Sequence, residues 1–94
     1  MDEEAKPELV SIIAGLSTDS RQYIANLAED QVIRLHHGLG TYIRNQYRHG
    51  RFRALFRWAG TQMPAEEKHL DSLSWPILLE VWKQVSASSN DEPS

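Results

Sequence analysis

The chain of 94 residues contains no cysteine. This absence excludes disulfide-stapled folds, cysteine-based zinc sites and thiol catalysis. No apolar run approaches the roughly 18 residues that a membrane-spanning helix needs, and the acidic residues 2–4 are unlike the start of a secretory signal. With 40 % hydrophobic and 24 % charged residues, the composition is typical of one small soluble domain. We therefore expect a cytoplasmic protein that does not act on membranes.

Several catalytic patterns are also missing from the sequence. There is no glycine-rich nucleotide loop, no nucleophile elbow and no pair of carboxylates arranged for acid–base catalysis. His36 and His37 are adjacent, so on a helix their side chains point about 100° apart and cannot easily share one metal ion. We expect no cofactor and no bound metal, and we favour a non-enzymatic protein over an enzyme.

Positive charge is concentrated in the middle of the chain. Residues 31–65 contain six arginines and no acidic residue, whereas residues 1–30 carry seven acidic and two basic side chains. Residues 66–94 carry six acidic and two basic side chains. Either the acidic ends fold against the basic centre and neutralise it, or the arginines form a basic face that binds an acidic protein or a nucleic acid.

All clear periodicity in the sequence is helical. It predicts an all-α fold of four to five short helices in a single compact domain at residues 7–86, with disordered segments at 1–6 and 87–94. The helices are expected at about 7–15, 20–27, 27–48, 51–59 and 72–86, and a continuous helix over 20–48 is the alternative for the second and third. The apolar stripes predict a core of Ile12, Ile13, Leu16, Leu27, Leu35, Leu39, Ile43, Phe52, Phe56, Leu78, Leu79 and Trp82.

Glycines interrupt the predicted central helix. Gly38 and Gly40 each cost about 1 kcal/mol relative to alanine in a helix interior. Together they indicate either that another helix crosses closely at this point or that the chain bends there. Gly50 is placed to cap the end of the same helix.

Residues 36–45 have the sequence His-His-Gly-Leu-Gly-Thr-Tyr-Ile-Arg-Asn, with Tyr47 shortly after. This stretch resembles the signature of a small family of uncharacterised bacterial domains, His-His-Gly-Leu-Gly-x-x-Ile-Arg-Asn followed by an aromatic residue. A later family segment, His-Pro-Asp-Asp-x-Ser, is matched only in part by residues 69–74, which lack its proline and its second aspartate. The resemblance covers about residues 27–85 and implies a shared helical fold without an assigned activity. We expect structural roles for His36, His37, Gly38 and Gly40.

Residues 44–49 also resemble the Arg-Asn-x-x-x-His motif of HEPN ribonucleases, which are small helical dimers that cleave RNA without a metal. By this resemblance Arg44 would hold the phosphate, His49 would transfer a proton and Asn45 would support the geometry. Residues five apart on a helix lie about 140° apart, so Arg44 and His49 could act together only at a helix end or across a dimer. The alternative is that Arg44 and Asn45 are structural and that His49 is a cation favoured at a helix C-terminus.

Basic and aromatic residues alternate over residues 51–58. Exposed arginine and tryptophan side chains are typical of binding surfaces. We expect the binding residues to be Arg44, Arg48, Arg51, Arg53, Arg57 and Trp58. The favoured hypothesis is a small bacterial or phage protein that binds a macromolecule, in the first place another protein, as an adaptor, an immunity protein or an inhibitor of a defence system. The alternative is an RNA-binding protein or HEPN-like ribonuclease that uses Arg44 and His49, and a homodimer is left open.

Overall fold

The computed structural model describes residues 1–64 and 69–91, with the side chains of 88–91 excepted. These residues contain no strand, and the chain is all-α and forms one small domain, as predicted. There is one helical element more than expected. The elements are α1 (Ala5–Ala14), α2 (Thr18–Ala25), the 3-10 helix η1 (Glu29–Leu35), α3 (Leu39–Arg48), α4 (Arg53–Thr61) and α5 (Leu70–Asp91).

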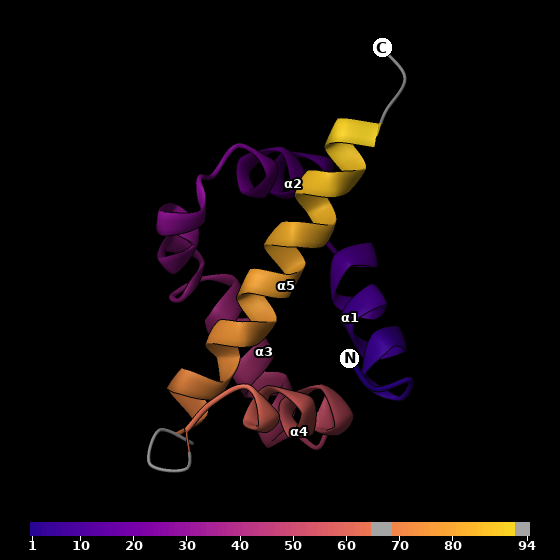
Figure 1. Cartoon of the computed structure of the whole chain (residues 1–94), viewed down its shortest axis with the longest axis vertical. Helices are drawn as coiled ribbons and strands as arrows, with labels where there is room; N and C mark the ends of the chain where they lie inside the picture. The colour runs from indigo at the N-terminus through magenta and orange to yellow at the C-terminus, as the bar shows by residue number, and fades with distance from the viewer. Residues whose placement is uncertain (65–68, 92–94) are drawn as a thin grey trace.

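Helix α5 is the element around which the others are arranged (Figure 1). All five other elements pack against it, and α1 packs in addition against α4. With 22 residues α5 is about 33 Å long, enough to run past every other element. Its side chains Ile77, Leu78 and Val81 are completely buried. The wide apolar stripe of this segment therefore marks the centre of the packing.

The hydrophobic core contains every residue predicted for it, at two levels of burial. The buried members of the predicted set are Ile12, Leu27, Leu35, Ile43, Phe52, Phe56 and Leu78. The partly buried members pack against these and are Ile13, Leu16, Leu39, Leu79 and Trp82. Further buried residues outside the predicted set include Ala5, Leu9, Ile24, Val32, Leu55 and Val81.

The helix predicted over residues 27–48 is wrong, and so is the continuous alternative over 20–48. The 3-10 helix η1 ends at Leu35, and α3 begins only at Leu39. Ala28 caps the start of η1, and its N–H donates to Oε1 of Gln31 at 2.9 Å. Gly38 precedes α3 with φ −92° and ψ −85°, outside helical geometry. This glycine therefore marks a bend, which is one of the two roles expected for the pair.

Gly40 has the other expected role, because it allows a close approach between elements. A Cβ atom at this position would lie 2.9 Å from Nη1 of Arg44 and 3.4 Å from Cδ1 of Leu78 on α5. It would also lie 3.4 Å from the carbonyl oxygen of Leu35. A glycine is thus needed where α3 crosses α5.

The turn between α3 and α4 is built on Gly50, which caps α3 as predicted. Gly50 has φ +89°, a conformation that favours glycine, and its N–H donates to the Tyr47 carbonyl at 2.9 Å. The Arg51 N–H donates to the Gln46 carbonyl at 2.9 Å, which completes the two hydrogen bonds of a Schellman motif. Phe52 follows in the left-handed region with φ 58°, and its ring is buried. Burial of this ring holds the backbone in a conformation that bulky residues rarely adopt.

The ends of the chain contain more helix than the sequence predicted. α1 already begins at Ala5, inside the segment expected to be disordered. α5 begins at Leu70 and continues through residues 87–91, which the polar composition assigned to a disordered tail. Its early start places Pro76 in the second turn of the helix. The remainder of the predicted tail, residues 92–94, lies outside the described residues.

Candidate functional site

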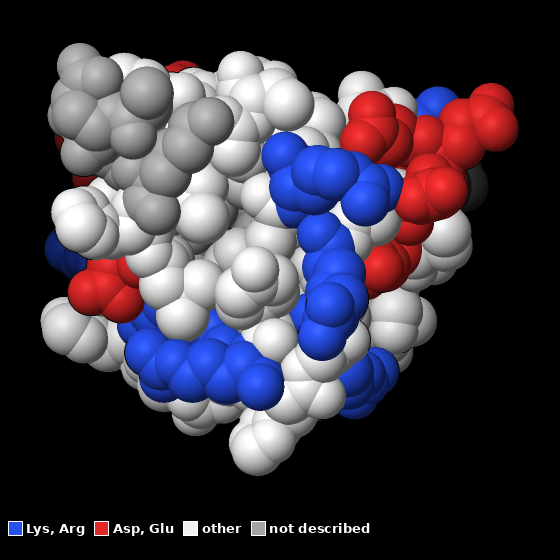
Figure 2. All heavy atoms as spheres, turned by 90° about the horizontal axis from the view of Figure 1, so that it is seen from below, with Lys and Arg blue, Asp and Glu red and all other residues white. Residues whose placement is uncertain are grey.

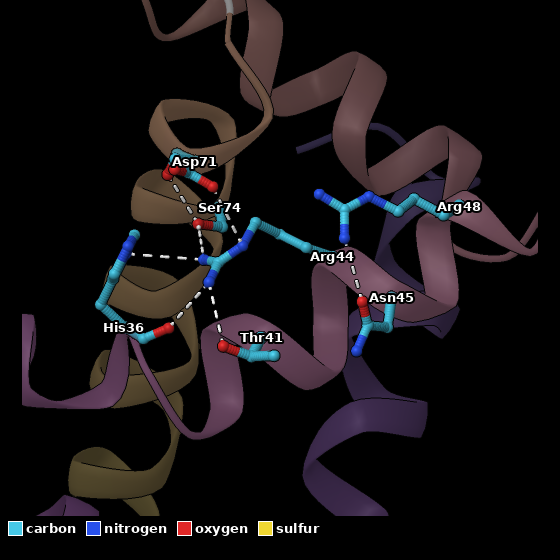
Figure 3. A network of polar contacts seen from close by, with 7 residues as sticks. All are labelled: His36, Thr41, Arg44, Asn45, Arg48, Asp71 and Ser74. Atoms are coloured by element: carbon cyan, nitrogen blue, oxygen red, sulfur yellow. Dashed lines mark hydrogen bonds and ion pairs between the residues drawn. The ribbon is translucent and has the colours of Figure 1, made fainter.

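The side chain of Arg44 lies inside the protein, where α3 meets η1 and the start of α5 (Figure 3). Only 7 % of Arg44 is exposed. Nη1 donates to Oγ of Ser74 at 3.0 Å and lies 3.5 Å from Nδ1 of His36. Nη2 donates to the His36 carbonyl and to Oγ1 of Thr41, both at 3.1 Å. Nε lies 3.3 Å from Oδ1 of Asp71, so every nitrogen of the guanidinium has a partner within the chain.

This geometry gives Arg44 a structural role. A guanidinium has five N–H donors, and the contacts within the chain use all three of its nitrogens. A phosphate or a partner's carboxylate could reach Arg44 only by displacing these contacts. The structure therefore does not bring Arg44 to the binding surface that was expected to include it.

The other residues of the expected catalytic motif lie apart from Arg44. Asn45 is exposed, and its Oδ1 accepts a hydrogen bond from Nη1 of Arg48 at 3.1 Å, away from the Arg44 contacts (Figure 3). His49 is exposed at the C-terminal end of α3. The histidine that does approach Arg44 is His36, which enters from the preceding turn. Within one chain, Arg44 and His49 do not form a common site.

His36 and His37 lie side by side between η1 and α3. Their rings are 5.2 Å apart and nearly perpendicular. His36 is half-buried and contributes its carbonyl to Arg44, whereas His37 is exposed. Within residues 1–64 and 69–91, no group of three or more His, Asp and Glu side chains could hold a metal ion. None of the helices described there is long and apolar enough to cross a membrane.

Four of the expected binding residues are exposed and lie on the last turn of α3, the following turn and α4: Arg48, Arg51, Arg53 and Arg57. We call these four residues the arginine cluster. Arg51 donates to Oε1 of Gln46 at 2.9 Å and lies over the Phe52 ring, 5.2 Å from its centroid. Arg53 donates from Nε to the Gly50 carbonyl at 3.3 Å. These contacts orient the guanidinium groups without neutralising them.

The acidic N-terminal segment reaches the arginine cluster at one point. Nη2 of Arg57 is 2.7 Å from Oε2 of Glu4, in a pair whose side chains are 60 % and 77 % exposed. Arg48, Arg51 and Arg53 form no ion pair with any residue that the structure describes. Figure 2 shows Lys and Arg side chains spread over the end of the molecule seen from below, with most of the visible Asp and Glu at one edge and a smaller group of them on the opposite side. The acidic N-terminal segment thus pairs with one arginine of the cluster, and the other three stay exposed without an ion pair among the described residues.

The aromatic residues near the cluster belong mainly to the core. Phe52 and Phe56 are buried, and the Tyr47 ring stacks on Phe56 with centroids 4.3 Å apart. Trp58 was singled out as a residue that could be exposed, but it is half-buried and packs against the core. Only part of its side chain is therefore available to a partner. The surface is thus formed chiefly by guanidinium groups rather than by a row of open aromatic rings.

Comparison with known proteins decides the family. Residues 8–85 match the family described as a domain of unknown function, DUF6794. The chain belongs to this family. The matched residues of this DUF6794 chain begin in the first turn of α1 and end at Val85. Val85 is the last core residue of α5. No curated protein and no solved structure matches the chain.

Proposed function

We propose that this DUF6794 chain is a non-enzymatic binding protein that attaches to an acidic surface of another protein through the arginine cluster. The main supporting observation is that four exposed guanidinium groups lie at one end of the molecule. Among the described residues only one carboxylate, that of Glu4, pairs with any of them, and it pairs with Arg57. Planar guanidinium groups contact carboxylates in bidentate fashion and are common at protein interfaces.

The mechanism that we propose is occlusion. Arginines that are already oriented lose little conformational freedom on binding, and Arg51 and Arg53 are both held by contacts to the turn between α3 and α4. A partner's carboxylates would pair with the free guanidinium groups, and the half-buried Trp58 would add apolar contact at the edge. A bacterial or phage protein of this kind would act as an adaptor, an immunity protein or an inhibitor of a defence system by covering an acidic site on its target.

RNA recognition is less well supported by the same geometry. Proteins that bind single strands stack bases on exposed aromatic rings, and the two phenylalanines beside the cluster are buried. Ribonuclease activity would need Arg44 to leave its contacts with Ser74 and Asp71. RNA cleavage that is lost in His49→Ala, with an unchanged melting temperature, would contradict the proposal and support the HEPN-like alternative.

The test is an affinity purification of the tagged chain from bacterial lysate, with and without nuclease, that measures both co-purified protein and RNA. The variant is Arg53→Glu/Arg57→Glu, and the control is Lys6→Glu/Lys83→Glu, which changes the net charge equally at two exposed positions outside the cluster. We expect one protein partner in stoichiometric amount that survives nuclease, is lost with the arginine variant and is kept by the control.

Two results would overturn the proposal. Recovery of RNA alone, or of a protein that disappears on nuclease treatment, would assign the cluster to nucleic acid. Equal loss of the partner with both variants would mean that net charge, rather than this surface, governs binding. The thermal stability of both variants should stay close to that of the wild type, because exposed ion pairs such as Arg57–Glu4 contribute only about 0–1 kcal/mol.

A further inference from the structure

An open hollow of about 520 Å³ lies between the end of α1, α2, η1 and the start of α3. Its apolar lining is formed by Leu16, Tyr23, Ile24, Leu35, Leu39 and Tyr42. A second hollow of about 190 Å³ beside α1 shares Leu16, Leu39 and Tyr42 with the first. The two hollows are therefore neighbours that share part of their walls, and together we call them the apolar depression. None of the arginine cluster lines it.

Two aromatic side chains stand at this depression and are largely uncovered. Tyr23 is 50 % exposed and Tyr42 is 47 % exposed. Large apolar patches on soluble proteins are commonly interaction sites, and tyrosine suits such sites because its ring is apolar while its hydroxyl stays hydrated. The depression thus offers both a hollow and two half-exposed aromatic side chains that a partner could contact.

The charges at the same depression are of opposite sign. Asp19 on α2 and Arg34 on η1 both line it, and neither forms an ion pair with a residue that the structure describes. A two-fold axis placed midway between this acid and this base would make the surface complementary to itself. The rotation would bring the arginine of each copy to the aspartate of the other.

We infer that a second copy of this chain covers the depression and forms a two-fold symmetric dimer. Tyr23 and Tyr42 of each copy pack into the depression of the other, and Arg34 pairs with Asp19 across the axis. The aromatic rings supply most of the affinity, while the exposed ion pairs set the orientation. The arginine cluster lies outside this interface, so the dimer would present two such clusters, and the inference does not depend on the proposed function.

Sedimentation velocity of the full chain, from low micromolar to submillimolar concentration, tests the dimer. We expect the wild type to dimerise and Tyr42→Glu to sediment as a single chain, with Tyr23→Ala weakening the dimer about tenfold. Val10→Glu is the matched control, because Val10 is an exposed apolar residue, 62 % accessible, outside the depression. Circular dichroism confirms that each variant keeps its helices.

Exchanging the charges of Asp19 and Arg34 distinguishes this dimer from a dimer formed through any other surface. Arg34→Asp and Asp19→Arg should each weaken the dimer several-fold, and the double variant should restore it, because each copy then again carries one acid and one base. Three results would overturn the inference: a wild type that stays a single chain at all concentrations, a dimer that survives Tyr42→Glu, or a double variant that associates no better than the single ones. In the first case the depression would be left for a different partner.

Discussion

Ser74 and Asp71 both contact Arg44, but their substitution should have unequal effects. Ser74 is completely buried, accepts a hydrogen bond from Arg44 and donates one to the Asp71 carbonyl at 2.8 Å. Ser74→Ala should lower the free energy of unfolding by about 1–3 kcal/mol, because a buried cationic N–H loses its acceptor. Asp71→Asn should cost less than about 1 kcal/mol, since the Asp71 side chain is 71 % exposed. Urea denaturation checks both values, and a larger cost for Asp71→Asn would contradict this assignment.

Substitution of Gly38 and Gly40 by alanine compares two glycines that have different roles in the fold. Gly40→Ala should destabilise the protein by about 1–3 kcal/mol despite the higher helix propensity of alanine, because the new Cβ would lie 2.9 Å from Arg44 and close to α5. Gly38→Ala should be neutral within about 0.5 kcal/mol, since nothing lies within 4 Å of its added Cβ. Thermal unfolding of the two variants measures the contrast. Similar losses for both would show that the bend, not the crossing, is what needs glycine.

The role of Arg44 could not be predicted from its neighbours in the sequence. The pattern around it fits a phosphate-binding arginine equally well, and the residues that bury it lie 8 positions before and 30 positions after it. Gly40 was more informative, because a glycine inside a predicted helix indicates either a close crossing or a bend, and both occur at this glycine pair. The positions of Arg53 and Arg57 on the side of α4 away from the core followed from the helical spacing of the apolar residues around them.

At the scale of single elements, the N-terminus of α4 is capped by a side chain from α1. Phe52 precedes α4 and has no side chain that can cap it, and the carboxylate of Glu8 instead accepts from the Leu55 N–H at 2.7 Å. Glu8→Ala should therefore lower stability by about 1–2 kcal/mol and speed hydrogen exchange at the Leu55 amide. Glu4→Ala is the control, because it removes only an exposed ion pair. Unchanged exchange at Leu55 would show that the cap is dispensable.

Most helices could be predicted because their apolar stripes have a clear period, and α1, α2, α4 and α5 all lie where expected to within a few residues at their starts. The exception is the break between η1 and α3. Val32, Leu35 and Leu39 follow a spacing that one long helix would satisfy, so periodicity alone could not reveal the turn. The 3-10 geometry of η1 places Val32 and Leu35, three residues apart, on the same face, and both are buried.

At the scale of the whole molecule, packing of every element on α5 predicts a single cooperative unit. Leu78 is completely buried in the middle of α5. Leu78→Ala should lower the free energy of unfolding by about 2–5 kcal/mol, and circular dichroism and tryptophan fluorescence should still report one common midpoint. Val10→Ala, at an exposed position, should change stability by less than about 0.5 kcal/mol. Two separate transitions would mean that part of the molecule folds independently of α5.

We infer that the arginines have two different roles. Arg44 is buried and holds the helices together, whereas the arginine cluster is left at the surface for a partner. Urea denaturation of one variant of each kind tests this inference. Arg44→Ala should lose about 2–4 kcal/mol, because it leaves the buried Ser74 hydroxyl and the half-buried His36 carbonyl without their donor and removes the packing of the buried arginine stem. Arg53→Glu/Arg57→Glu should remain within about 1 kcal/mol of the wild type. A stable Arg44→Ala protein, or an unfolded surface variant, would contradict this division of roles.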